Sequence, residues 1–233
     1  MTNTANRSFR WLFWTLAIVG LCLDQGSKYG VFAWLSHVPV SPNINKHGDQ
    51  EVEVVADVFY FAVNYSRGTK PDDDWRRPFQ TISNEKLPEV NHGALWGIGG
   101  KDETGADFNH IFAIVSIAAA VAIVIWSFRK ATAHDRWLCM ALGLILAGTL
   151  GNLYDRVIFH GVRDFLQWVY KYDWPRFNVA DSCLVCGAGL LLIQAFFTPP
   201  VEEKKTPETA SAGVDAKAAT ADALQQSAVA EAK

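Results

Sequence analysis

Two aspartates in the C-terminal half of the chain have the residue type and setting of a catalytic acid pair. Asp164 lies in Gly161-Val-Arg-Asp-Phe-Leu166, and Asp181 lies in Phe177-Asn-Val-Ala-Asp-Ser182. Amide hydrolysis needs one ionised carboxylate to take a proton from water and one protonated carboxyl to protonate the leaving nitrogen. Like charges in contact favour one shared proton near neutral pH. Taken alone, however, Asp164 is better explained as an ordinary loop acid and Asp181 as an ordinary acid in the first turn of a helix.

Further polar side chains lie within or beside apolar segments, where a charge at a helix centre costs about 2.5 to 3.5 kcal/mol. Asp24 and Lys28 are four residues apart with the acid first, which predicts a structural ion pair on one helix face. Asn152 and Arg156 share the same spacing. Asp155 is interpreted as a partner of Arg156, and a simple polar helix end remains an equal alternative for this motif.

Other kinds of chemistry are excluded or disfavoured by the sequence. It contains no GxSxG elbow, no HExxH zinc helix and no GxxxxGK[ST] phosphate loop. Cys183 and Cys186 have CxxC spacing but no second Cys or His pair, so we expect no metal and no cofactor. We interpret all four cysteines as small buried hydrophobic residues. A net charge of −3 without a basic stripe argues against a nucleic-acid partner.

The segments that must position these residues are strongly apolar. A membrane-spanning helix needs about 20 largely apolar residues to cross about 30 Å of hydrocarbon. Four segments qualify, at about 9–35, 111–128, 137–154 and 179–197. The sequence therefore predicts an all-α integral membrane protein with four transmembrane helices.

Two polar regions accompany these helices. The run Val52–Val63 is rich in β-branched and aromatic residues, which predicts β-structure in an extracytoplasmic insertion. The C-terminal region lacks apolar periodicity and is predicted to be a disordered cytoplasmic tail. We divide the chain into 1–36 (N-terminus and first helix), 37–109 (insertion), 110–200 (helices two to four with both aspartates) and 201–233 (tail).

Basic and aromatic residues near the helix ends predict the orientation. The basic residues are Arg7 and Arg10 before the first helix, Arg129, Lys130 and Arg136 between the second and third, and Lys204 and Lys205 after the fourth. Since basic residues favour the cytoplasmic side, both termini should face the cytoplasm and both aspartates the outer face. Tryptophans agree, with Trp11, Trp14, Trp126 and Trp137 at the predicted inner interface and Trp34, Trp168 and Trp174 at the outer one.

Five motifs, in this order, resemble those of lipoprotein signal peptidases, also called signal peptidase II. They are Asp24-Gln-Gly-Ser-Lys28, Asn91-His-Gly-Ala-Leu-Trp-Gly97, Gly151-Asn-Leu-Tyr-Asp-Arg156, Val162-Arg-Asp-Phe165 and Phe177-Asn-Val-Ala-Asp181. The resemblance covers about 10–36 and 91–197. Each motif alone is weak, but five in order around four apolar segments are highly specific.

The resemblance implies an aspartic endopeptidase of the bacterial cytoplasmic (inner) membrane. Such an enzyme removes signal peptides from diacylglyceryl-modified prolipoproteins by cleaving before the lipidated cysteine, without metal or cofactor. It implies that Asp164 and Asp181 are catalytic. The implied supporting residues are Asp24, Lys28, Asn91, Gly93, Asn152, Asp155, Arg156, Asn178 and Ala180. We expect a monomer whose partners are prolipoproteins and membrane lipids.

Two features depart from the family pattern. Arg163 precedes Asp164 where the family usually has an apolar residue, so the arginine either points away or lowers the pKa of Asp164. The stretch before Asn91 is long, and Asn64 with Gly68 is a second candidate for the Asn-x-Gly motif.

Two non-enzymatic classes compete with the protease hypothesis. A transporter or proton conduit could use Asp24, Lys28 and Asp181 as a relay, although no paired half-sequences suggest inverted repeats. An assembly factor with an external β-rich module would leave the two candidate catalytic aspartates unexplained.

Overall fold

The apolar segments form the long helices of the protein. The computed structural model describes residues 7–38, 50–66, 74–80, 87–93, 108–172 and 174–197. Its elements are α1 (Arg10–His37), β1 (Gln50–Val55), β2 (Phe59–Val63), β3 (Tyr65–Ser66), α2 (Arg77–Gln80), β4 (Leu87–Pro88), α3 (Asn109–Ser127), α4 (Lys130–His134), α5 (Arg136–Phe159), β5 (Leu166–Trp168) and α6 (Val179–Phe197). The predicted tail at 201–233, and Ala94 of the predicted Asn-x-Gly-Ala segment, lie outside the described residues.

The helix bounds match the prediction closely except at the end of α5, which continues past Tyr154 to Phe159. By length and composition, α3, α5 and α6 could each cross a membrane. The described part of the chain gives no fourth such helix, since α1 is long but carries charged residues in its interior. Three of the four predicted spans are therefore supported, and the span at α1 stays a prediction.

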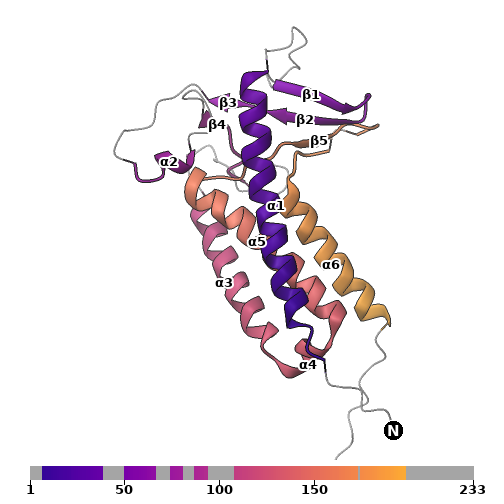
Figure 1. Ribbon diagram of the computed structural model, residues 1–233. Helices are drawn as coiled ribbons and strands as arrows, with labels where there is room; N and C mark the ends of the chain where they lie inside the picture. Colours follow the sequence, from indigo (N-terminus) through magenta and orange to yellow (C-terminus); the bar gives the residue numbers. More distant parts are fainter. Residues whose placement is uncertain are drawn as a thin grey trace, which may run out of the picture. The chain divides into compact units, whose positions relative to one another are not determined.

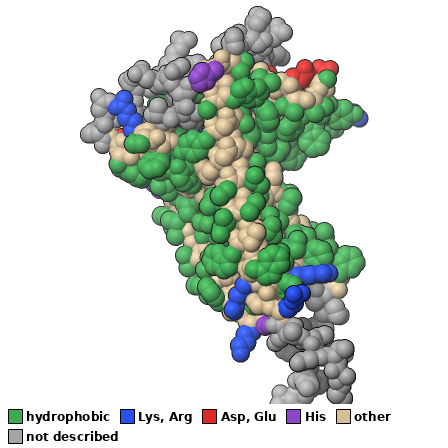
Figure 2. Space-filling view, in the orientation of Figure 1, with side chains coloured by type: hydrophobic (Ala, Val, Ile, Leu, Met, Phe, Trp, Pro, Cys, Tyr) green, Lys and Arg blue, Asp and Glu red, His purple; other side chains and the backbone are tan. Residues whose placement is uncertain are grey.

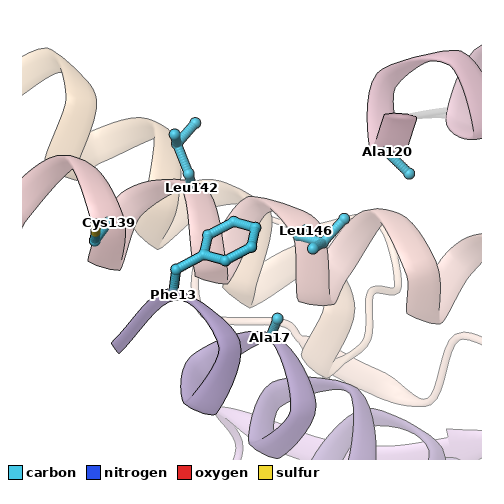
Figure 3. Packing of buried hydrophobic residues seen from close by; sticks show 6 residues of the cluster. All are labelled: Phe13, Ala17, Ala120, Cys139, Leu142 and Leu146. Carbon is cyan, nitrogen blue, oxygen red and sulfur yellow. The ribbon is translucent and has the colours of Figure 1, made fainter. Parts of the chain in front are cut away.

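α5 is the helix against which the other long helices pack. It contacts α1, α3 and α6, and Figure 1 shows α3 and α6 on its two sides with α1 across it. Near the start of α1, Phe13 and Ala17 pack against Leu142 and Leu146 of α5, with Cys139 and Ala120 in the same cluster (Figure 3). This packing fixes α1 along α5.

The contact between α5 and α6 depends on small residues. A Cβ atom added at Gly148 would lie 2.3 Å from the carbonyl oxygen of Ala180, and one at Gly187 would lie 2.8 Å from that of Ala141. A Cβ at Gly189 would meet nothing within 4 Å. The predicted role of Gly187 in close helix contact is thus confirmed, whereas Gly189 faces open space.

Gly148→Ala is expected to destabilise the protein and lower its activity, because the new methyl group must push α6 away from α5 beside Asp181. Overpacking of this kind typically costs about 1–3 kcal/mol. Thermal unfolding in detergent, with Gly189→Ala as the matched helical control, measures the effect. Equal melting temperatures for the two variants would contradict the close-packing argument.

The outward faces of the helices are apolar, as Figure 2 shows for one side of the molecule. Ile114 and Val121 of α3 and Val185 and Leu192 of α6 are all exposed. Cys22 and Cys186 are exposed too, and Cys183 is half-buried, so the prediction of four buried cysteines is correct only for Cys139. All four cysteines are free thiols. The exposed apolar faces of the helices suit contact with lipid.

A small sheet covers one end of the helices (Figure 1). The run at 52–63 is not a single strand: β1 and β2 form a hairpin through a turn in which Asp57 has φ 55°. β5 pairs with β2, so the sheet order is β1-β2-β5, and β3 pairs separately with β4. The sheet is therefore not confined to the 37–109 insertion, because β5 begins two residues after Asp164.

The short helix α2 lies against the end of α5. The hydroxyl of Tyr29 donates to the carbonyl oxygen of Phe79 at 2.8 Å, and Gln80 donates to the carbonyl oxygen of Ile158. These contacts hold α2 beside the same end of the bundle as the sheet.

Candidate active site

Backbone hydrogen bonds bring the segments of the two aspartates together. After α5 ends, Val162 and Asn91 exchange two backbone bonds of 2.8 Å. The amides of Phe165 and Leu166 both donate to the carbonyl oxygen of Phe177, just before α6. Asp164 therefore lies beside the first turn of α6.

Asn178 connects the two carboxylates. Its Nδ2 donates to Asp164 Oδ1 at 2.7 Å, and its Oδ1 accepts from the amide of Asp181 at 3.0 Å. Asp181 Oδ2 accepts in return from the amide of Asn178 at 3.1 Å. The predicted helix cap is confirmed as a reciprocal capping box, and the same fully buried asparagine also holds Asp164.

Two further asparagines complete the contacts of the pair. Asn91 Nδ2 donates to Asp164 Oδ2 at 3.1 Å, and Asn152 Nδ2 donates to Asp181 Oδ1 at 2.8 Å. Asn91, rather than Asn64, is thus the asparagine brought to Asp164. Within the described residues, all of these donors are neutral amides, which leave either carboxyl free to hold a proton.

The environment of Asp164 favours its protonated form. Burial, and then the negative charge of Asp181, raise the pKa of Asp164 to about 7. Hydrogen bonds from Asn91 and Asn178 and the positive charge of Lys28 act in the opposite direction but are weaker. Asp164 can therefore carry a proton near neutral pH, which an acid catalyst requires.

A buried network of four charged side chains adjoins the residues that contact Asp164 and Asp181. Lys28 Nζ contacts Asp24 at 2.9 Å and Asp155 at 3.2 Å, so the predicted Asp24–Lys28 ion pair is confirmed. Asp155 also pairs with Arg163 at 2.8 Å. The predicted pairing of Asp155 with Arg156 is wrong, because consecutive helix residues point in different directions.

Lys28 and Asp24 reach the pair through hydrogen bonds. Lys28 Nζ and Asn178 Nδ2 each donate to Asn152 Oδ1 at 3.2 Å, which directs the other side of that amide to Asp181. Asp24 Oδ1 accepts from the amide of Ala180 at 2.8 Å, in the first turn of α6. The supporting residues thus fix the orientation of the residues that touch the carboxylates.

Arg156 holds the segment that carries Asn91. Its guanidinium donates to the carbonyl oxygen of Gly93 at 3.1 Å and to Asn109 Oδ1 at 3.3 Å, and it lies over the ring of Phe112. The amide of Gly93 in turn donates to Asn91 Oδ1 at 3.0 Å. Sequence reasoning missed Asn109, whose only signal was a polar residue at the start of an apolar helix.

The structure resolves the two readings of Arg163. Its side chain points away from Asp164 and binds Asp155 and Gln25. Neither Gln25 nor Arg163 was predicted as a site residue, although both are polar residues inside recognised motifs.

In the described part of the chain, no group of three or more His, Cys, Asp or Glu side chains is arranged to hold a metal ion.

Comparisons with known proteins agree on one family. The family model described as Signal peptidase (SPase) II matches residues 87–197. A lipoprotein signal peptidase of Rhodopirellula baltica is 36% identical over 198 residues, which cover 79% of this chain and 71% of that protein. Another, of Pseudomonas syringae pv. tomato, is 30% identical over 90% of this chain and 95% of its own length.

The fold also resembles a solved structure. A bacterial membrane enzyme determined by the in meso method at 2.3 Å resolution superposes with a TM-score of 0.58 at 23% identity. The superposition covers 87% of this chain and 98% of that one.

Proposed function

This chain belongs to the signal peptidase II family, a family of proteases, and we propose from that membership that it is an aspartic endopeptidase acting on lipid-modified prolipoproteins. The substrate class follows from the name of its relatives, which are lipoprotein signal peptidases. The proposed cleavage lies directly before the diacylglyceryl-modified cysteine.

The observation that carries the aspartic mechanism is the double contact of Asn178. This buried residue donates to Asp164 Oδ1 through its side chain and to Asp181 Oδ2 through its backbone amide, so the two carboxyls share one small site. Repulsion between like charges in such a site keeps one proton on the pair near neutral pH.

The proposed reaction uses the two carboxyls in turn. The ionised Asp181 takes a proton from water, whose oxygen attacks the carbonyl carbon before the lipidated cysteine. Protonated Asp164 stabilises the carbonyl oxygen as negative charge develops on it. The carbon–nitrogen bond then breaks as a carboxyl returns a proton to the leaving amine of the cysteine. The raised pKa of Asp164 supports its role as the acid.

Purified protein incubated with a diacylglyceryl-modified prolipoprotein tests the proposal. We expect a shorter product that keeps its lipid, and no cleavage of the same precursor before lipid modification. An unchanged modified precursor would refute the proposed function, and equal cleavage of both precursors would refute the lipid requirement.

The competing transporter reading is not favoured. Asp24, Lys28 and Asp181 do lie in one network, but Asp181 is in the first turn of α6 and Asp24 accepts from the amide of Ala180 in that same turn, so the acids gather at one end of α6 rather than along a path. A membrane conduit needs polar groups distributed across the hydrocarbon region.

We further propose that α1 is the fourth span of a monomeric inner-membrane enzyme. Its charges are paired internally, which lowers their cost within the membrane. In this topology both termini and the tail at 201–233 are cytoplasmic, and the sheet and the aspartates lie at the outer face. Membrane-impermeant maleimide added to intact spheroplasts should label a cysteine introduced at Tyr172 but not one introduced at Lys130. The opposite pattern would refute this orientation.

A further inference from the structure

Arg163 is the residue that departs from the family pattern, and it is completely buried. Its backbone amide donates to Asp155 Oδ2 at 2.9 Å, and its Nη2 donates to Asp155 Oδ1 at 2.8 Å. Nη2 also donates to Gln25 Oε1 at 2.8 Å. The residue next to Asp164 is thus attached to both α5 and α1.

The guanidinium lies between two aromatic rings. Its Cζ is 4.0 Å from the ring centroid of Phe159 and 4.2 Å from that of Tyr29. Nη1 is buried and has no hydrogen-bond partner among the described residues. Because one of its N–H groups makes no hydrogen bond to a described residue, the guanidinium interacts with its surroundings mainly through its positive charge. That charge pairs with Asp155 and lies against the two aromatic rings.

Arg163 completes the charge balance behind the pair. Asp24 and Asp155 carry two negative charges, and Lys28 and Arg163 carry two positive ones. Without Arg163, Lys28 alone would face two buried carboxylates. Its ammonium would then be drawn toward Asp155 and away from Asn152, the amide that donates to Asp181.

We propose that Arg163 is a positioning residue that neutralises Asp155, so that Lys28 can help to hold Asn152 against Asp181 and the network of Asp24, Lys28, Asp155 and Arg163 carries no net charge. The inference rests on the proposed function, because it assigns the pair its catalytic role. It assigns a role to a residue that lies inside one of the five motifs but departs from the family pattern.

The proposal predicts opposite effects from the two members of the Asp155–Arg163 ion pair. Among the described residues, the ionisable groups in or against this network are Asp24, Lys28 and Tyr29 from α1, Tyr154, Asp155 and Arg156 from α5, Arg163 from the following segment, and Asp181 and Cys183 from α6. Removing the positive charge makes the catalytic pair hold its proton more strongly, so its pH–activity curve moves to higher pH. Removing the negative charge of Asp155 moves the curve to lower pH.

The experiment measures the pH–activity profile of four proteins. Relative to wild type, Arg163→Met should move the profile upward by roughly half a unit to one unit, and Asp155→Asn should move it downward. The double variant should return to about the wild-type position, because both charges are gone. Arg163→Lys keeps the charge and should leave the position unchanged even if turnover falls.

A purely structural role would give a different result. If Arg163→Met lowers turnover while its profile keeps the wild-type position, or if the double variant does not return, the inference is wrong. If Arg163→Met does not fold, the pH–activity profiles of Asp155→Asn and of the double variant still test the proposal. The infrared carboxyl band of Asp164, titrated without substrate, gives the same comparison, so that failure of the proposed cleavage and failure of this inference remain distinguishable.

Discussion

Asp164→Asn and Asp181→Asn should each abolish cleavage of a lipid-modified prolipoprotein, with turnover reduced roughly ten-thousand-fold or more. Asparagine keeps the shape of the side chain and one of the two hydrogen bonds that each carboxylate accepts, since its NH2 group donates rather than accepts. It can neither take a proton from water nor return one. The double variant should be little worse than either single variant, because the two carboxyls act as one unit.

The pH dependence follows from the shared proton. With the pKa of Asp164 at about 7, activity should fall on the alkaline side as the pair loses its proton and both carboxyls become charged. It should fall again on the acid side, where both carboxyls are protonated and neither accepts a proton from water. The profile is therefore bell-shaped, with apparent pKa values that belong to the pair.

The measurement is turnover of a purified, lipid-modified precursor, with folding checked by thermal unfolding. Glu89→Gln is the control, since Glu89 is exposed and its backbone amide donates to the carbonyl oxygen of Asn64, which is not a residue of the site. Near wild-type cleavage by either aspartate variant would remove that aspartate from the mechanism.

The long helices were predictable because their signal is local. Length and continuous hydrophobicity define a helix without knowledge of its partners, and the bounds of α6 agree with the prediction. The Asp24–Lys28 pair and the Asn178 cap were predictable for the same reason, since each depends on residues three or four positions apart.

Contacts between distant segments were not predictable in the same way. β5 has three residues, and it is a strand because β2, far upstream, pairs with it. The partners of Asp155 come from α1 and from the segment after α5. The sequence predicts that this helix ends at about Tyr154, because Asp155 and Arg156 are residues of the type found where a helix leaves the membrane. In the structure both are buried and have partners.

Burial of the cysteines shows a limit of a different kind. An apolar segment predicts that a side chain avoids water, but not whether it packs against protein or faces outward. Cys139 is covered by other residues and Cys186, on α6, is exposed. In a protein that contacts lipid, both positions are compatible with the same apolar sequence.

Lys28→Met should strongly lower both stability and activity, because Lys28 connects the charge network to the catalytic pair. Loss of the ammonium leaves Asp24 buried without a cation, which typically costs about 3–5 kcal/mol, whereas Asp155 keeps Arg163. It also removes the charged one of the two donors that orient Asn152 and leaves Asn178 Nδ2, so the amide that donates to Asp181 is held less firmly.

A second substitution separates these two effects. In the double variant Asp24→Asn, Lys28→Met, no unpaired charge remains at this position, so thermal stability should largely recover. Turnover should stay at least about a hundred-fold below wild type, because Asn152 still lacks the charged one of its two donors and keeps only Asn178. Melting temperature and cleavage rate are measured on the same preparations. If activity recovers together with stability, Lys28 only neutralises Asp24; if stability recovers alone, Lys28 holds Asn152 in the orientation that the catalytic pair requires.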